Sequence, residues 1–187
     1  IHTVLQLRVH PELIKLKQTL QEQGGQHDVE LTYITSRGPW YQVSWKGHED
    51  KSGGVATNIG VHFFDLLLWL FGSTHGIKVY HSDESRMSGF IELEHARVRW
   101  FLSVDKNDLP FSAKAGSKTT FRSITVDGKE IEFSEGFTDL HTRVYEETLA
   151  GRGFGIKDAR PSIDLTYAIR SAEISPKDEL IHPLLKK

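Results

Sequence analysis

The sequence predicts an α+β domain in which an open, mixed and largely antiparallel sheet carries helices on one face. Three observations predict this class: strand-like segments cluster in the middle of the chain, a long apolar helical segment precedes them, and helical segments close the chain. The 187 residues are 38% hydrophobic and 26% charged, as in an ordinary globular domain. We therefore expect one domain over residues 1–187.

The first elements alternate between helix and strand. A short apolar segment at 3–7 precedes residues 12–23, which contain good helix formers with apolar residues near helical spacing, and Gly24 and Gly25 end this helix. Residues 28–35 alternate with period two and predict a strand. A long polar and aromatic loop is expected over 36–54.

The middle and end of the chain contain the remaining elements. A helix is predicted from about Val55 to Phe71, because this apolar segment is too long for a strand and ends at a glycine. The predicted strands are 77–81, 87–94, 96–104, 119–126 and 129–133. Asp127 and Gly128 form the preferred two-residue hairpin turn between the last two. Two closing helices are predicted at 138–150 and 161–174, the second with Pro161 in its first turn.

Three aromatic residues occupy positions on the otherwise polar face of the predicted sheet: Phe90, Phe101 and Phe121. They indicate either pairing of this face with another chain or scattered surface aromatics, and both interpretations stay open.

Composition excludes several function classes. Lysine and arginine number 23 against 25 acidic residues, for a net charge of −2, which argues against nucleic-acid binding. The chain has no cysteine, which removes disulfides, thiolate nucleophiles and cysteine zinc sites and is compatible with a cytoplasmic protein. The histidines lack metal-ligand spacing, so no metal is expected. The longest apolar run is too short to cross a membrane, and no membrane association is expected.

The strongest candidate for chemistry is the stretch from Gly53 to Asp65. On a helix, Asn58, His62, Asp65 and Trp69 fall along one stripe, at i, i+4, i+7 and i+11. A buried imidazole needs partners, and Asn58 and Asp65 can fix its tautomer. The alternative is a core histidine satisfied by local hydrogen bonds. The glycines at 53, 54 and 60 favour a crowded ligand site over that alternative.

A second candidate is the loop over 36–47. Arg37 and Lys46 can bind phosphate or carboxylate, while Trp40, Tyr41 and Trp45 offer flat surfaces for a ring. Cations mixed with aromatics suit a nucleotide or sugar ligand. The alternative is a loop that folds its aromatic side chains into the core and leaves its charges in water.

The motif at 53–65 resembles the signature of the Gfo/Idh/MocA oxidoreductases, which have a Gly-Gly pair, an Asp-x-x-x-His and a further Asp on one helix. Here the residues are Gly53 and Gly54, Asn58 with His62, and Asp65. The resemblance covers residues 1–187 as the substrate-binding and oligomerisation domain of that family. The family's N-terminal Rossmann NAD-binding domain is absent from this chain, which starts without methionine, so we expect a part of a longer protein.

Within that family, the segments 37–47 and 51–60 are similar to the UDP-N-acetylglucosaminuronate 3-dehydrogenases of bacterial lipopolysaccharide O-antigen synthesis. The resemblance implies NAD-dependent oxidation of the sugar C3 hydroxyl to a ketone, with His62 and a lysine of the missing domain handling the proton. Asn58 replaces the aspartate of the broader family; it can orient His62 but cannot stabilise an imidazolium by charge.

The resemblance also implies substrate contacts and partners. The expected contacts are Arg37, Tyr41, Lys46 and Ser52, and the expected assembly is a homo-oligomer, a dimer or tetramer, through the open sheet face. The domain alone is expected to be inactive. Two other functions stay open: a family dehydrogenase for another sugar or polyol, and an oligomerisation and ligand-binding module without catalysis.

Overall fold

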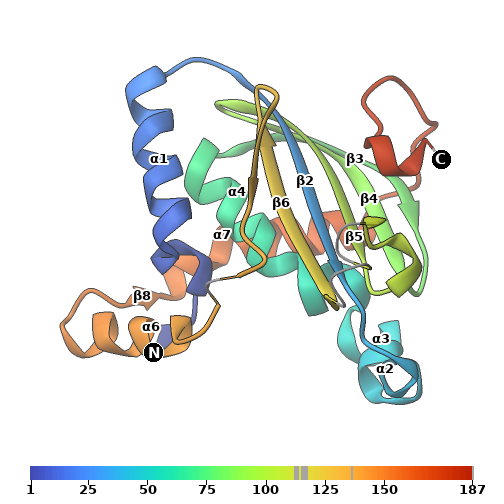
Figure 1. Ribbon diagram of the computed structural model, residues 1–187, viewed down its shortest axis with the longest axis horizontal. Coiled ribbons are helices and arrows are strands. Elements are labelled where there is room, and N and C mark those ends of the chain that lie inside the picture. The colour runs from blue at the N-terminus through green and yellow to red at the C-terminus, as the bar shows by residue number, and fades with distance from the viewer. Residues whose placement is uncertain (112–113, 115–117, 136, 187) are drawn as a thin grey trace.

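A single mixed sheet of six strands organises the molecule, in the order β3-β4-β5-β2-β6-β7 (Figure 1). The computed structural model describes residues 1–111, 114, 118–135 and 137–186. The strands of the sheet are β2 (His27–Thr35), β3 (Thr74–Ser82), β4 (Arg86–Leu93), β5 (Ala96–Ser103), β6 (Thr120–Val126) and β7 (Lys129–Glu132). Neighbouring strands run antiparallel except β2 and β5, which are parallel. The predicted α+β class with a largely antiparallel sheet is confirmed.

Three of the longer helices cover one face of this sheet (Figure 1). The helices are α1 (Pro11–Gln23), α2 (Pro39–Val43), α3 (Glu49–Ser52), α4 (Val61–Phe71), α6 (Leu140–Leu149) and α7 (Ile156–Ser171). Two short strands, β1 (His2–Thr3) and β8 (Phe154–Gly155), pair antiparallel outside the main sheet. Helices α1, α4 and α7 lie on the same side of the sheet (Figure 1), as predicted. None of the helices in the described ranges has the length and apolar content needed to cross a bilayer.

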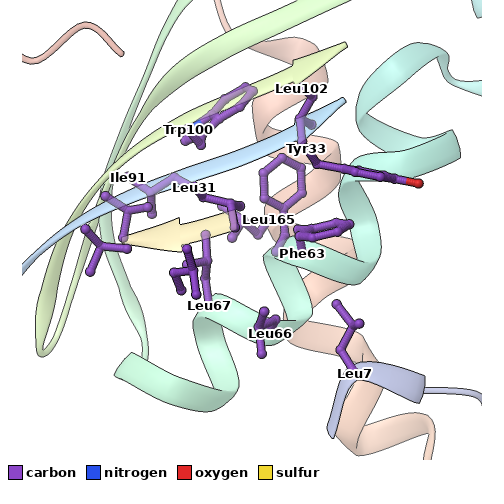
Figure 2. Close-up of a cluster of buried hydrophobic side chains, with 14 of the residues drawn as sticks. Leu7, Leu31, Tyr33, Phe63, Leu66, Leu67, Ile91, Trp100, Leu102 and Leu165 are labelled. Carbon is purple, nitrogen blue, oxygen red and sulfur yellow. The ribbon is translucent and has the colours of Figure 1, made fainter. Parts of the chain in front are cut away.

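Helix α4 is the centre of the hydrophobic core. Its Phe63 stacks on Tyr33 of β2 with ring centroids 4.4 Å apart, and its Phe64 meets Trp100 of β5 edge-on at 5.4 Å. In Figure 2, Phe63 and Leu67 point from α4 toward β2, the strand that carries Leu31 and Tyr33. Aromatic pairs in these geometries contribute about 0.5–1.5 kcal/mol beyond the area that they bury. The packing therefore holds α4 firmly against the sheet.

This packing requires glycine at two positions, Gly89 and Gly60, because a Cβ there would clash with its neighbours. A Cβ on Gly89 would overlap the carbonyl of Lys78 and lie 2.6 Å from the Trp100 ring, so β4 leaves room there for the indole. A Cβ on Gly60 would lie 2.8 Å from Leu102 and 2.9 Å from Phe64. Gly60 therefore serves the close approach of the helix to the sheet rather than the crowded ligand site expected from the sequence.

Three predicted boundaries differ from the structure. The expected loop over 36–54 is folded into α2, a 3₁₀ turn at Trp45–Gly47 and α3. The predicted helix from Val55 to Phe71 exists, but its first part is a π turn, Ala56–Gly60, which holds one extra residue per turn. Helix α7 begins five residues before Pro161, which lies inside it rather than in its first turn.

The aromatic residues on the outer face pack within the chain. Phe101 is 2% exposed and stacks on His182 with centroids 5.6 Å apart, and Phe90 is 6% exposed. The segment after α7 crosses this face, where Leu184 packs with Phe101 and Phe121. Phe90 and Phe101 are therefore buried within the chain rather than scattered surface aromatics, and pairing of this face with another chain stays a prediction.

His182 anchors that segment. Its Nδ1 accepts a hydrogen bond from the backbone N–H of Leu184 at 3.2 Å, and its Nε2 lies 3.1 Å from the Thr32 hydroxyl. Burial lowers the pKa of His182 to about 3, and the charge of Arg99 acts in the same direction. The ring is therefore neutral in the folded protein across the physiological range.

We predict that acid weakens the protein through His182. The imidazole titrates near pH 6.5 when unfolded and near 3 when folded, so between these values the unfolded chain binds a proton that the folded chain does not. This residue should remove about 1.4 kcal/mol of unfolding free energy per pH unit as the pH falls below about 6.5. Urea unfolding at pH 7.5 and 5.0 measures this loss. His182→Gln should be less stable at pH 7.5 but lose less between the two pH values; equal losses in parent and variant would contradict the assignment.

Candidate functional site

The side chain of Asn58, in the π turn before α4, joins the loop over 36–54 to the helix. Its amide nitrogen lies 3.1 Å from the Tyr41 hydroxyl, 3.1 Å from the Lys46 carbonyl oxygen and 2.9 Å from the Ser52 hydroxyl. Ser52 in turn donates to the Lys46 carbonyl at 2.9 Å and accepts from the N–H of Gly54 at 3.1 Å. The structure thus brings together four of the residues predicted from the sequence.

These contacts explain why asparagine suits position 58. An amide nitrogen can donate to a carbonyl oxygen, whereas both oxygens of an ionised aspartate accept only. An aspartate here would place a carboxylate oxygen against the Lys46 carbonyl. The departure from the broader family pattern therefore has a local cause in the fold of the loop.

We predict that Asn58→Asp destabilises the protein by about 1–3 kcal/mol, because a partly buried donor that faces a carbonyl is replaced by a repelling acceptor. The unfolding free energy at pH 7 measures the effect. Asn107→Asp is the matched control, since it makes the same change of amide to acid at an exposed residue. Equal stability of the two variants would show that the amide contact to Lys46 contributes nothing.

His62 lies in the first turn of α4 and is partly buried. Burial lowers the pKa of its imidazole below the usual value; Asp65 acts in the opposite direction, and His141 of α6 adds to the lowering. The ring is therefore neutral near pH 7 and free to accept a proton. Histidine in this state is the commonest general base of enzymes.

The polar stripe on the helix does not form one hydrogen-bonded trio. Asp65 pairs with Arg8, whose Nη2 lies 2.7 Å from Oδ1, and Asn58 bonds to the loop. Trp69, at the far end, lies under the ammonium of Lys17 at 4.2 Å. The prediction that Asn58 and Asp65 fix the tautomer of His62 is thus not met by hydrogen bonds, although Asp65 still acts on His62 through its charge.

The aromatic residues of the loop divide between core and surface. Tyr41 is 3% exposed, whereas Trp40 and Trp45 are 53% and 58% exposed. The ammonium of Lys46 lies 6.0 Å from the Trp40 ring and 5.8 Å from the Trp45 ring. The alternative in which the loop hides all its aromatics is therefore wrong for both tryptophans.

Two cavities flank Tyr41. One, of about 230 Å³, is bordered by Lys46, Gly53, Gly54 and Arg170 and also by four carboxylates. These carboxylates belong to Glu49, Asp50, Asp83 and Glu84. The other, of about 360 Å³, is bordered by Arg37, Val104, Asp105 and Lys106. Arg37 and Lys46 therefore lie on different sides of Tyr41.

Arg37 has an unmatched polar atom. Its Nε is buried and finds no hydrogen-bond partner among the described residues. Its charge lies close enough to Tyr41 to favour the ionised phenol, while burial, the larger effect, raises the pKa of Tyr41 and keeps it protonated. A buried donor without a partner is costly, so Arg37 is suited to receive an acceptor from outside the described chain.

The described residues offer neither a metal site nor an evident cradle for a dinucleotide. No group of three histidine, aspartate or glutamate side chains in these ranges is arranged to hold a metal ion. The glycine-rich run at 151–155 leads into α7, but the N–H of Gly155 donates to Asp158 Oδ2 at 2.7 Å. This helix start already holds a carboxylate, which would repel a phosphate.

Sequence reasoning missed Arg8 and His141. Nothing in the sequence around Arg8 marks its partner 57 residues away. His141 lies on the exposed side of α6 and acts on His62 only because the fold brings α6 close. Both contacts are tertiary and leave no periodic signal in the sequence.

Comparisons with known proteins identify relatives of this architecture. A family model described as "Oxidoreductase family, C-terminal alpha/beta domain" (GFO_IDH_MocA_C) matches residues 25–112. The WlbA (WbpB) dehydrogenase from Thermus thermophilus, solved with NAD and alpha-ketoglutarate, is 54% identical with a TM-score of 0.93. Its complex with NAD and UDP-GlcNAcA is 53% identical with the same TM-score.

In both cases the match covers 97% of this chain and 59% of the solved chain. The chain thus spans about three fifths of the length of these dehydrogenases. The WlbA dehydrogenase from Bordetella pertussis, solved with NADH and UDP-GlcNAcA, matches 89% of this chain and 60% of that chain. At 20% identity and a TM-score of 0.66, this likeness shows the shared fold alone.

Proposed function

Because the chain belongs to the Gfo/Idh/MocA oxidoreductases, whose C-terminal alpha/beta domain it forms, we propose that it is the substrate-binding and oligomerisation domain of an NAD-dependent dehydrogenase. The proposed reaction oxidises the C3 hydroxyl of UDP-N-acetylglucosaminuronic acid to the 3-keto sugar, for surface-polysaccharide synthesis. The observation that carries the proposal is the 53% identity, over 97% of this chain, to a dehydrogenase solved with NAD and UDP-GlcNAcA.

The proposal assigns the dinucleotide to an N-terminal Rossmann domain, since the capped start of α7 does not suit a phosphate. Oxidation of an alcohol removes a hydride from carbon and a proton from oxygen, and bound NAD supplies the hydride acceptor. The role of this chain is to bind the sugar nucleotide, orient its C3 hydroxyl and accept the proton on His62. A partly buried neutral imidazole supports that role.

Asn58 supports the site by position. Its amide holds the Lys46 carbonyl, Tyr41 and Ser52 against the turn that leads into His62. The hydroxyl of Ser52 is already engaged by Lys46, Gly54 and Asn58, which favours an indirect contribution of Ser52 through the loop. Arg37, Tyr41 and Lys46 remain the proposed contacts to the substrate.

The two cations suit an anionic sugar nucleotide. The buried and unpartnered Nε of Arg37 is available for a carboxylate or phosphate oxygen. Lys46, between two exposed indoles, combines a charge with flat surfaces for a base or sugar ring. A sugar nucleotide with a diphosphate, a uronate and a uracil offers anionic groups to Arg37 and Lys46 and a flat ring to the two indoles.

The proposal includes assembly into a homo-oligomer through the outer face of the sheet. This face contains a hollow of about 700 Å³, lined in part by Phe101, Leu109, Leu184 and Leu185, beside Phe111, which is 86% exposed. An exposed phenylalanine beside a hollow of mixed polar and apolar lining is compatible with a surface covered by a partner.

The proposed function predicts turnover confined to the uronate. The full-length protein should reduce NAD, followed at 340 nm, with UDP-N-acetylglucosaminuronate but not with UDP-N-acetylglucosamine or free sugars. His62→Asn should lower kcat by about 10²–10⁴, the usual contribution of a general base. His75→Asn, an exposed histidine on β3, is the matched control and should keep full activity. If the protein turned over a different sugar and not the uronate, the proposed substrate would be wrong. If it turned over none of these sugars, a binding module without catalysis would be favoured.

Binding of the substrate charges should depend on both cations. Arg37→Ala and Lys46→Ala should each raise the KM for the uronate by about 10–100-fold, because hydrogen bonds to charged groups contribute about 1.5–3 kcal/mol. Lys51→Ala is the control, since Lys51 is an exposed cation of α3. Unchanged KM values in the first two variants would exclude these residues as substrate contacts.

A further inference from the structure

A buried ion pair links α4 to the N-terminal part of the chain. Arg8, in the 3₁₀ turn Gln6–Val9, reaches Asp65 with two nitrogens: Nη2 lies 2.7 Å from Oδ1 and Nε lies 3.0 Å from Oδ2. The two side chains are 13% and 3% exposed. A guanidinium that meets both oxygens of a carboxylate fixes its orientation as well as its charge.

The same guanidinium also contacts the start of α7. Nη2 donates to the backbone carbonyl of Asp158 at 3.2 Å, and the group lies 5.5 Å from the centre of the Phe154 ring. The Asp158 carboxylate, 4.0 Å from Nη1, is occupied in capping α7 through Gly155. Arg8 therefore ties the middle of α4 to the start of α7, and Asp65 is its nearest carboxylate.

Asp65 lies one helical turn after His62, so their side chains share a face of α4. A carboxylate at this spacing favours the protonated imidazole, and its effect on His62 is indeed to raise the pKa. Burial, the larger effect, and His141 of α6 lower it. The charge left on Asp65 after pairing with Arg8 is thus the contribution that favours a protonated imidazole against burial and His141.

We propose that Arg8 is a positioning residue of the active site, which holds the α4 turn that carries His62 and neutralises the Asp65 carboxylate so that His62 stays unprotonated. The proposal deepens the proposed function, because it rests on His62 as the proton acceptor. Arg8 contacts the Asp65 side chain and the start of α7, so the proposal gives it no contact to the substrate. Its whole effect passes through Asp65.

The test is a titration of His62 in the full-length protein labelled with ¹³C at histidine Cε1, with the resonance assigned by its loss in His62→Asn. Arg8→Met should raise the pKa of His62 by about one unit or more, the effect of an uncompensated carboxylate. Arg8→Lys, which keeps the charge without the fork, should raise it less. The double variant Arg8→Met with Asp65→Asn removes both charges and should return the pKa to within about 0.3 units of the parent.

The kinetics should follow the titration. Arg8→Met should lose about tenfold in kcat at pH 6.5 and recover most of it at pH 8.5, with little change in KM, whereas a purely structural role gives a loss that pH does not restore. Should Arg8→Met fail to fold, Arg8→Lys and the double variant decide the question. An unchanged pKa in the single variants, or an equal rise in single and double variants, would overturn the proposal.

The NMR titration separates this proposal from the proposed function. If the parent protein turns over no substrate but the pKa shifts follow the predicted order, Arg8 controls His62 and the reaction must be reassigned. If the parent is active on the uronate and the pKa of His62 is unchanged in the Arg8 variants, the proposed function stands and Arg8 contributes to the fold alone.

Discussion

The packing of α4 between the sheet and the other helices is the constraint on which the rest of the structure depends. Phe64 and Leu67 are fully buried and Phe63 nearly so, against Tyr33, Trp100 and their neighbours. Because the helix is apolar on most of its surface, it can bury this area only where its few polar groups find partners. Those groups are Asn58 in the preceding turn, His62 and Asp65, and they are the groups that carry the proposed chemistry.

Each polar group meets this constraint in a different way. The Asn58 amide donates a hydrogen bond to the loop, Asp65 forms an ion pair with Arg8, and His62 stays neutral because burial opposes its charge. The division leaves one reactive group, the imidazole, between two groups that are already satisfied. A general base needs this condition: a fixed position, a free lone pair and no strong partner that holds a proton on it.

The parts of the fold predicted from the sequence are those with local signals. The five later strands, the hairpin at Asp127 and Gly128, and α1 follow from periodicity and turn chemistry, and both turn residues have the positive φ that the prediction requires. Pro161 misled the prediction because α7 begins five residues earlier, at Ile156, directly after Gly155, whose N–H is capped by Asp158. The C-terminal segment over Phe101 left no local pattern at all.

The sequence marks candidate residues for the site but not their hydrogen-bond partners. The motif marks His62 and Asn58 as candidates, and the loop composition marks Tyr41 and Lys46. The Arg8 fork on Asp65 joins residues 57 apart in the sequence, and the hydrogen bond that Asn58 donates to the Lys46 carbonyl joins residues 12 apart. Helical spacing places side chains on one face, but only the tertiary fold decides which neighbour takes each hydrogen bond.

A structure of the full-length protein with NAD and UDP-N-acetylglucosaminuronate tests the central claim most directly. The account predicts the sugar C3 hydroxyl within about 3.2 Å of a ring nitrogen of His62, the distance over which a general base acts. Asp65 should still be held by Arg8 in that complex. A sugar bound with its C3 hydroxyl beyond reach of His62, even through one water, would contradict the account.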